Sequence, residues 1–134
     1  MHFRTLLLLG MLALIAADSA VPGYQSAQAN HILFKEEEPV ECEKTKALIT
    51  ALPKDQQFDA FTSYAKSLSK CPSGSNGGDL GEFGPHQMVA AFDSVVFASG
   101  KLQEVEGCVK TQFGQHLIWI RKRVYADGTD EPLP

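Results

Sequence analysis

A glycine-rich segment in the middle of the chain sets the strongest limit on its fold. Residues 71–84 read CPSGSNGGDLGEFG and hold five of the eleven glycines of this 134-residue chain. Such a segment either makes special backbone turns or brings the backbone close to a ligand. We expect one short strand, at residues 80–83, inside it.

The first residues are typical of a targeting signal. A short basic region precedes twelve apolar residues, 6–17, and small residues follow. This is the layout of a secretory signal peptide, with cleavage after Ala17 or Ser19. An uncleaved anchor is the alternative, although twelve residues are few for a membrane span. We therefore expect residues 1–19 to be a signal peptide and residues 20–27 a flexible lead-in.

Composition and charge exclude several classes of function. Hydrophobic residues make up 44% of the chain and charged residues 21%, which indicates one globular domain. The net charge of −4 gives no basic surface for nucleic acid. After signal cleavage we expect a monomer without stable membrane insertion. The signal predicts the secretory pathway, meaning secretion, the endoplasmic reticulum or the periplasm, with a signal-led plastid address as an alternative.

Hydrophobic patterning predicts an α+β domain over residues 28–124, with helices packed on a small antiparallel sheet. The predicted strands are residues 28–35, 80–83, 109–111 and 117–124. The predicted helices are residues 40–52, a second helix capped by Asp55, and residues 85–97. Residues 125–134 form an acidic tail that ends in proline, and we expect it to fray.

Few residues outside the predicted signal can carry chemistry. His31 opens the first predicted strand and His116 the last, and a single histidine on a strand is more often a structural hydrogen-bonding group than a catalyst. Cys42, Cys71 and Cys108 form no CxxC motif, so zinc and thioredoxin-like sites are disfavoured. The pairing of the three cysteines stays open. Cys71 with either histidine is a candidate nucleophile and base, so a secreted thiol enzyme is one alternative.

Four motifs follow one another along the chain: ANHIL at 29–33, CPSGSNGGDLG at 71–81, QMV at 87–89 followed by Phe92, and VKTQFGQHLI at 109–118. In this order the motifs resemble the parvulin family of peptidyl-prolyl cis-trans isomerases. The resemblance runs from residue 28 to about residue 123. It implies an FKBP-like fold, a four-stranded antiparallel sheet surrounded by helices. It also implies rotation of Xaa-Pro bonds in proline-containing polypeptides, a folding function that requires no metal or cofactor.

The resemblance also assigns site residues. The positions that match the family's proline-binding cup are Leu80, Met88, Phe92 and Phe113. Met88 and Phe92 would share one face of the predicted helix 85–97, since residues four apart are neighbours on a helix.

The positions that match the family's catalytic group are His31, Cys71, Thr111 and His116. The resemblance implies that the two histidines orient each other, that Thr111 supports them and that Cys71 lies near the substrate carbonyl. A disulfide from Cys71 to Cys42 or Cys108 would remove its thiol from the site.

The chain departs from the family pattern at two places. The phosphate-directed branch carries a basic cluster after the first strand, where this chain has three acids, 36–38. Carboxylates there would repel a phosphoserine dianion, so we expect no phosphate specificity, and a neutral or basic residue before the proline. Ala91 and Cys108 stand where the family often has proline, which predicts a local loop change.

The alternative of a different class is a catalytically weak, parvulin-like chaperone module that holds unfolded chains. An intact cup and two histidines weigh against it.

Overall fold

The computed structural model of the chain describes residues 23–134, and the predicted signal peptide lies outside the described residues. The elements in chain order are β1 (Tyr24–Phe34), α2 (Pro39–Thr50), α3 (Lys54–Leu68), the 3-10 turn η1 (Pro72–Asn76), β2 (Asp79–Phe83), α4 (Ala90–Ser94), the π-helical turn η2 (Val95–Ser99), β3 (Val105–Thr111) and β4 (Gly114–Tyr125).

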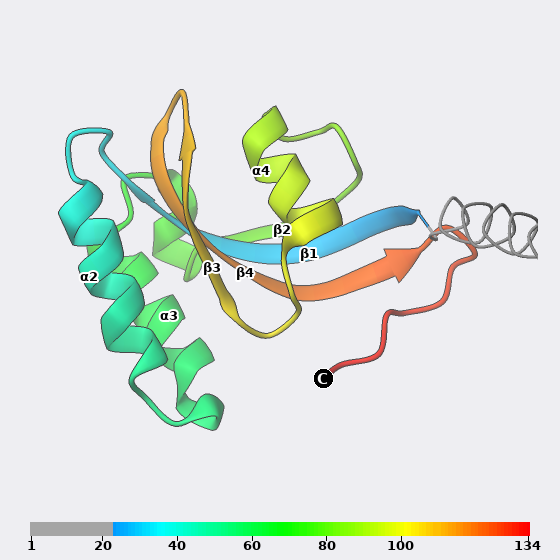
Figure 1. Cartoon of the computed structure of the whole chain (residues 1–134), viewed down its shortest axis with the longest axis horizontal. Coiled ribbons are helices and arrows are strands. Elements are labelled where there is room, and N and C mark those ends of the chain that lie inside the picture. Colours follow the sequence, from blue (N-terminus) through cyan, green and yellow to red (C-terminus); the bar gives the residue numbers. More distant parts are fainter. Residues whose placement is uncertain (1–22) are drawn as a thin grey trace, which may run out of the picture.

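The four strands form one antiparallel sheet in the order β2-β1-β4-β3. The two long strands, β1 and β4, lie side by side at its centre, so the start of β1 and the end of β4 meet at one end of the molecule (Figure 1). The predicted α+β fold with a four-stranded antiparallel sheet is confirmed.

Alternating side chains of β4 build two cores, one on each face of the sheet. Leu117 and Trp119 pack with the buried side chains of α2 and α3. Ile118 and Ile120 pack with Phe92 and other residues around α4. Successive strand residues point to opposite faces, which explains this division. Figure 1 shows α2 and α3 on one side of the sheet and α4 on the other.

The first two helices follow the prediction closely. Pro39 opens α2, where a proline needs no hydrogen-bond acceptor. The apolar stripe of α3 buries Phe61 and Ala65 completely. Asp55 does not cap α3 as predicted, because the helix already begins at Lys54 after Pro53 and Asp55 lies within its first turn. Within residues 23–134, no helix is long and apolar enough to cross a membrane.

Both ends of the described chain are more ordered than predicted. β1 begins at Tyr24, so residues 24–27 belong to the sheet and not to a lead-in. The tail is not frayed along its length, because the backbone N–H of Glu131 donates to the carbonyl of Arg123 at 2.9 Å. The start of β1 pairs with the end of β4, as Tyr24 does with Tyr125. A local sequence pattern does not predict pairing between residues so far apart.

The predicted helix 85–97 is wrong at its start. Residues 85–89 form turns, with His86 at a positive φ of 67°, and α4 begins only at Ala90. The backbone N–H of His86 donates to the Asp93 carboxylate at 2.6 Å, which holds the turn against the helix. Met88 therefore precedes the helix that carries Phe92, and the two do not share a helical face.

β3 is longer than predicted and irregular. It begins at Val105, four residues before the predicted start, and its register against β4 shifts between Glu106 and Val109. The predicted local change at Cys108 falls within this irregular part. The Cys108 sulfur is bonded to Cys42 of α2, so a disulfide joins α2 to β3 and leaves Cys71 as a free thiol.

Candidate active site

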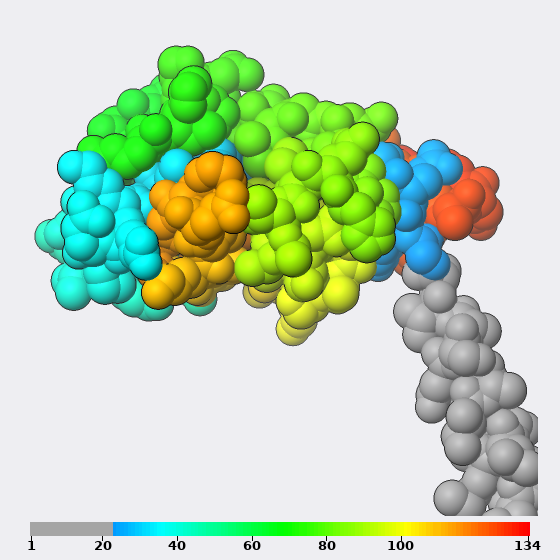
Figure 2. Space-filling model, turned by 90° about the horizontal axis from the view of Figure 1, so that it is seen from above, coloured from blue at the N-terminus to red at the C-terminus, as the bar shows by residue number. Residues whose placement is uncertain are grey.

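One cavity of about 520 Å³ lies at the end of the sheet where β1, β4 and the β3–β4 turn meet. Its wall is mostly apolar, and twelve residues line it: His31, Leu33, Lys70, Cys71, Pro72, Leu80, Gln87, Met88, Val89, Phe92, Phe113 and His116. Figure 2 shows the orange β3–β4 turn, which carries Phe113, between α2 and the segment before α4.

Neighbouring strands place the two histidines face to face. His31 lies on β1 and His116 on β4, and in the register of this pair His116 stands opposite Leu33. The ring centroids are 5.3 Å apart with an interplanar angle of 19°, and the two Nδ1 atoms are 3.1 Å apart. Only 5% of the surface of His31 and 4% of the surface of His116 remain exposed to solvent.

Gly78 fixes the backbone at His31. The His31 N–H donates to the Gly78 carbonyl at 2.9 Å. Gly78 has a φ of +82°, and a Cβ there would lie 2.1 Å from the His31 carbonyl oxygen. Only glycine combines this backbone conformation with so close an approach. The glycine pair in the central loop therefore sets how β2 meets β1 beside the site.

Burial keeps both imidazoles neutral. Removal from water, and to a lesser extent repulsion from His116, together lower the pKa of His31 to about 4. Burial likewise lowers the pKa of His116 to about 4. At neutral pH the pair therefore presents hydrogen-bonding groups without positive charge.

Hydroxyl groups at either end of the pair determine the tautomers. Thr111 Oγ1 accepts the N–H of Phe113 at 3.1 Å and lies 2.7 Å from Nε2 of His116. At the other end, Ser73 Oγ lies 3.1 Å from Nε2 of His31 and donates to the Cys71 sulfur at 3.2 Å.

In one arrangement of protons, the hydroxyl hydrogens of both Thr111 and Ser73 are donated to a partner. Thr111 donates to Nε2 of His116, whose Nδ1–H donates to Nδ1 of His31, whose Nε2–H donates to Ser73. We assign the tautomers from this pattern. The polar network thus runs in one direction, from Thr111 to Cys71.

The structure brings all eight predicted site residues together. Seven of them line the cavity, and Thr111 reaches it through its hydrogen bond to His116. Phe92 stands edge-on to both histidine rings, at interplanar angles of 79° and 82°. Phe113 is 60% exposed at the rim. Met88 reaches the cavity from the turn before α4 and not from the predicted helix.

Sequence reasoning missed Ser73 and the remaining wall residues. The signal that could have found Ser73 is its position two residues after Cys71 at the start of the glycine-rich segment. The three acids of residues 36–38 do not line the cavity, and Glu36 forms an exposed ion pair with Lys110 at 3.4 Å. Among residues 23–134, no group of three or more His, Cys, Asp or Glu residues is arranged to hold a metal ion.

Comparison with known proteins identifies the family. The model of the PPIC-type PPIase domain matches residues 12–123. The chain belongs to this family, the parvulin-type peptidyl-prolyl isomerases. This confirms the resemblance inferred from the four motifs.

Relatives of this parvulin-type domain are mostly longer proteins. The foldase protein PrsA of Geobacillus kaustophilus is 38% identical over 109 residues, which are 78% of this chain and 36% of that protein. The peptidyl-prolyl cis-trans isomerase ESS1 of Saccharomyces cerevisiae is 38% identical over 76 residues, which are 57% of this chain and 44% of that protein. The chain spans only 36% and 31% of two Geobacillus PrsA relatives.

Solved structures confirm the parvulin fold. PrsA from Bacillus subtilis is 34% identical with a TM-score of 0.56, over 72% of this chain and 34% of that one. PrsA from Bacillus cereus is 27% identical with a TM-score of 0.62, over 82% and 37% of the two chains.

Proposed function

We propose that this protein is a peptidyl-prolyl cis-trans isomerase that accelerates rotation of Xaa-Pro bonds in client polypeptides and so assists their folding. The observation that carries the proposal is an apolar cavity whose inner end is a neutral, hydrogen-bonded histidine pair. The uncatalysed rotation crosses a barrier of about 18–20 kcal/mol and takes tens to hundreds of seconds.

The cavity suits a reaction that breaks no covalent bond. Leu80, Met88 and Phe92 would hold the proline ring, and Phe113 would close over it from the rim. With the ring held, the rest of the substrate turns about the Xaa-Pro bond. Catalysis requires that the twisted amide be favoured over the planar one.

Neutral histidines help to favour the twisted amide over the planar one. A planar amide carries a polarised carbonyl oxygen, and its polarity falls when the bond twists and resonance is lost. A cation beside that oxygen would stabilise the planar ground state. His31 and His116, which burial keeps uncharged, can orient the carbonyl through Ser73 and Cys71 without this effect.

The same cavity supports activity without phosphate specificity. Lys70 is the only lysine or arginine among its lining residues. Strong recognition of a phosphate favours the paired donors of guanidinium groups or several cations. Glu36 and Glu37 are exposed after β1, and Glu36 pairs with Lys110 of β3, which removes a free cation that could attract a phosphate there.

The disulfide supports a secretory location for the protein. The Cys42–Cys108 bond would persist in an oxidising compartment and would be rare in a reducing one. One matched structure comes from a pair of SurA-like chaperones of Campylobacter jejuni, one of which is described as a periplasmic protein. We propose that the chain enters the secretory pathway through the signal at residues 1–19 and acts as a monomer, which mass measurement in solution tests.

A protease-coupled assay on the purified protein tests the isomerase. The substrates are peptides with Leu, Arg, Glu or phosphoserine before the proline. The variant carrying both Phe92→Ala and His116→Ala is the control. We expect acceleration by the native protein, loss of it in the variant, and no advantage for phosphoserine.

Each other result has a distinct meaning. The greatest acceleration with phosphoserine would contradict the argument from Lys70 and the acids while leaving the isomerase intact. Peptide binding without acceleration would replace the isomerase by a module that holds unfolded chains.

A further inference from the structure

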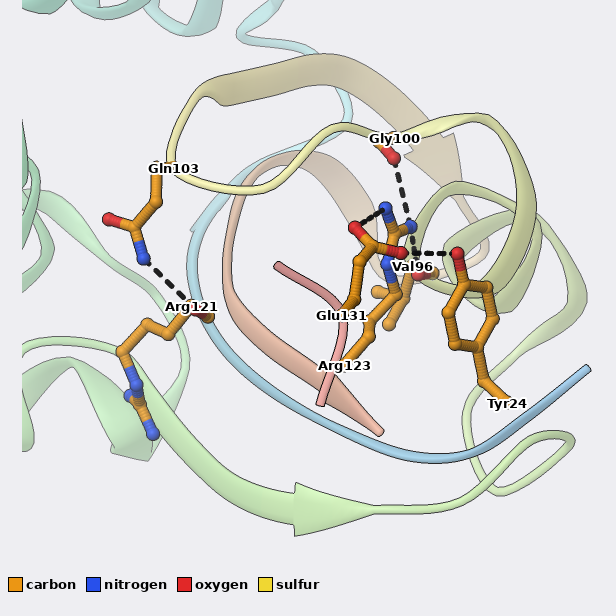
Figure 3. A network of polar contacts seen from close by, with 7 residues as sticks. All are labelled: Tyr24, Val96, Gly100, Gln103, Arg121, Arg123 and Glu131. Atoms are coloured by element: carbon orange, nitrogen blue, oxygen red, sulfur yellow. Dashed lines mark hydrogen bonds and ion pairs between the residues drawn. The ribbon is translucent and has the colours of Figure 1, made fainter. Parts of the chain in front are cut away.

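A buried arginine lies far along the sheet from the histidines. Arg123, near the end of β4, is only 5% exposed. One guanidinium nitrogen donates to two backbone carbonyls, those of Val96 and Gly100, both at 2.9 Å. The other terminal nitrogen pairs with the Glu131 carboxylate, also at 2.9 Å. Figure 3 shows the guanidinium between the carboxylate and the two carbonyls.

Tyr24, the first residue of β1, completes this group. Its hydroxyl donates to the second oxygen of the Glu131 carboxylate, and the Arg123 guanidinium lies over its ring at 4.8 Å from the centroid. We call Tyr24, Arg123 and Glu131 the tail clamp. A buried guanidinium group is costly unless it is paired and hydrogen-bonded. The buried Arg123 therefore requires the Glu131 carboxylate as its partner.

Backbone pairing brings Glu131 to this place. After a turn, the tail runs back along β4, with the Tyr125 N–H donating to the Thr129 carbonyl at 2.8 Å and the Glu131 N–H donating to the Arg123 carbonyl at 2.9 Å. The tail therefore holds its carboxylate against Arg123 through backbone hydrogen bonds to the end of β4.

A bulge in β4 turns Arg123 toward α4. The register of β1 against β4 shifts between the pairs Ala29–Ile120 and Gln28–Lys122, which leaves Arg121 as the extra residue. Ile118 and Ile120 face the α4 core, and one extra residue moves that face from position 122 to position 123.

The two carbonyls that Arg123 binds lie at the C-terminal end of the helix that carries Phe92 of the cup. Val96 and Gly100 lie in and just after η2, which continues α4 directly. The last carbonyls of a helix have no partner within it, and a cation there satisfies them and interacts well with the helix dipole. Phe92, which faces the two histidines, lies one turn earlier on the same helix.

Aromatic packing connects the clamp to the cup by a second route. The Tyr24 ring lies 6.5 Å from that of Phe97, which stands edge-on to Phe83 at 5.9 Å. Phe83 in turn lies 6.5 Å from Phe92. The clamp and the cup therefore share one packed cluster.

We infer that Arg123 is a positioning residue for the proline cup, and that Glu131 of the tail holds it in that role. Arg123 fixes the end of the α4–η2 helix and with it the place of Phe92 against the histidine pair. The inference rests on the proposed isomerase function, because it assigns the clamp to the cup of that site.

Two readouts on the full chain test this role. Glu131→Ala removes the carboxylate, and Asp130→Ala is the matched control, since Asp130 carries the same charge in an exposed pair with Lys122 at 3.3 Å. The first readout is kcat and KM for a Leu-Pro peptide, at a temperature where both variants are fully folded. The second is the methyl NMR signal of Met88, which lines the cup and is the only methionine after residue 11.

We expect Glu131→Ala to lower kcat/KM about three- to thirtyfold, mainly by raising KM, and to shift the Met88 signal. Glu131→Gln, which keeps a hydrogen-bonding amide in place, should recover part of the loss. Asp130→Ala should leave both readouts as in the native protein. A lower stability of Glu131→Ala with unchanged kcat/KM and an unchanged Met88 signal would overturn the inference and leave the clamp a purely structural feature.

The two proposals fail separately. If the native protein shows no isomerase activity, the proposed function is wrong. Titration of the Met88 signal with a proline peptide then still decides whether loss of Glu131 weakens the cup. If Glu131→Ala does not fold, Glu131→Gln against Asp130→Asn makes the same comparison with smaller changes.

Discussion

Single hydroxyl groups determine the tautomers of the histidine pair. Both imidazoles are buried, so each ring nitrogen needs a partner, and two facing Nδ1 atoms can share only one proton while both rings are neutral. Thr111 determines which ring carries that proton, because its hydroxyl donates to Nε2 of His116. The tautomer of His31 follows, and with it the donor that reaches Ser73.

Replacement of Thr111 tests this dependence. Thr111→Val leaves Nε2 of His116 buried without a partner, which should lower the free energy of unfolding by about 1–3 kcal/mol. Isomerase activity should fall as well, because the tautomers are no longer fixed. Thr111→Ser keeps the hydroxyl and is the control. Urea unfolding and the peptide assay measure both effects, and equal behaviour of the two variants would rule out the assigned direction of the network.

Elements with a clear local pattern were predictable, and those shaped by distant contacts were not. The stripe of α3 and the proline that opens α2 are local signals, and both helices formed as expected. The turn at residues 85–89 was missed because its stability comes from the Asp93 carboxylate and a positive φ at His86. Tyr24 joins the sheet through β4, about one hundred residues away, which no local pattern reveals.

The site shows the same division. Resemblance to the parvulins placed His31, His116 and the cup residues at one cavity, since the motifs fix their identity and order. Ser73 escaped because its contact with His31 depends on the 3-10 turn that follows Cys71. The disulfide partner of Cys108 escaped because cysteine spacing alone does not determine pairing.

The disulfide ties α2 to β3, which are otherwise joined by packing and by a hydrogen bond from the Lys46 ammonium group to the Gly107 carbonyl. Cys42 on α2 is completely buried, and its partner on β3 lies 66 residues away in sequence. Replacing both by alanine should lower the free energy of unfolding by about 2–4 kcal/mol, because the unfolded chain regains the freedom of a long loop. Denaturant unfolding measures the loss, and Cys71→Ala, which removes the free thiol, should show none of this size. Equal stability of the double variant and the native protein would contradict the expected role.

At the scale of the whole molecule, the sheet carries two cores that serve different purposes. The α2–α3 face packs around Trp119 and includes Cys42 of the disulfide, whereas the α4 face contains Phe92 and continues into the cavity. The histidine pair lies on the two long central strands and packs against Phe92, so its burial is a property of the complete fold. Its titration therefore reports on global stability.

Stability should fall as the pH drops below about 6.5. In the unfolded chain each histidine binds a proton near its ordinary pKa of 6.5, whereas in the folded protein the pKa of both His31 and His116 is about 4. Between these values the unfolded state binds more protons, so acidification favours unfolding, and each histidine costs roughly 2 kcal/mol between pH 6.5 and pH 5. The carboxylates with a lowered pKa, Asp79, Asp127 and Glu131, affect stability only at lower pH, because their ordinary values are 3.8 to 4.5.

Urea unfolding at pH 7, 6 and 5 measures this dependence, and NMR titration of the ring protons assigns it to the two histidines. A constant free energy of unfolding over this range, with ring signals titrating near pH 6.5, would show that the pair is charged at mildly acidic pH. The neutral site on which the proposed mechanism depends would then exist only above that pH. Isomerase activity would have to decline in parallel with protonation, well before the protein unfolds.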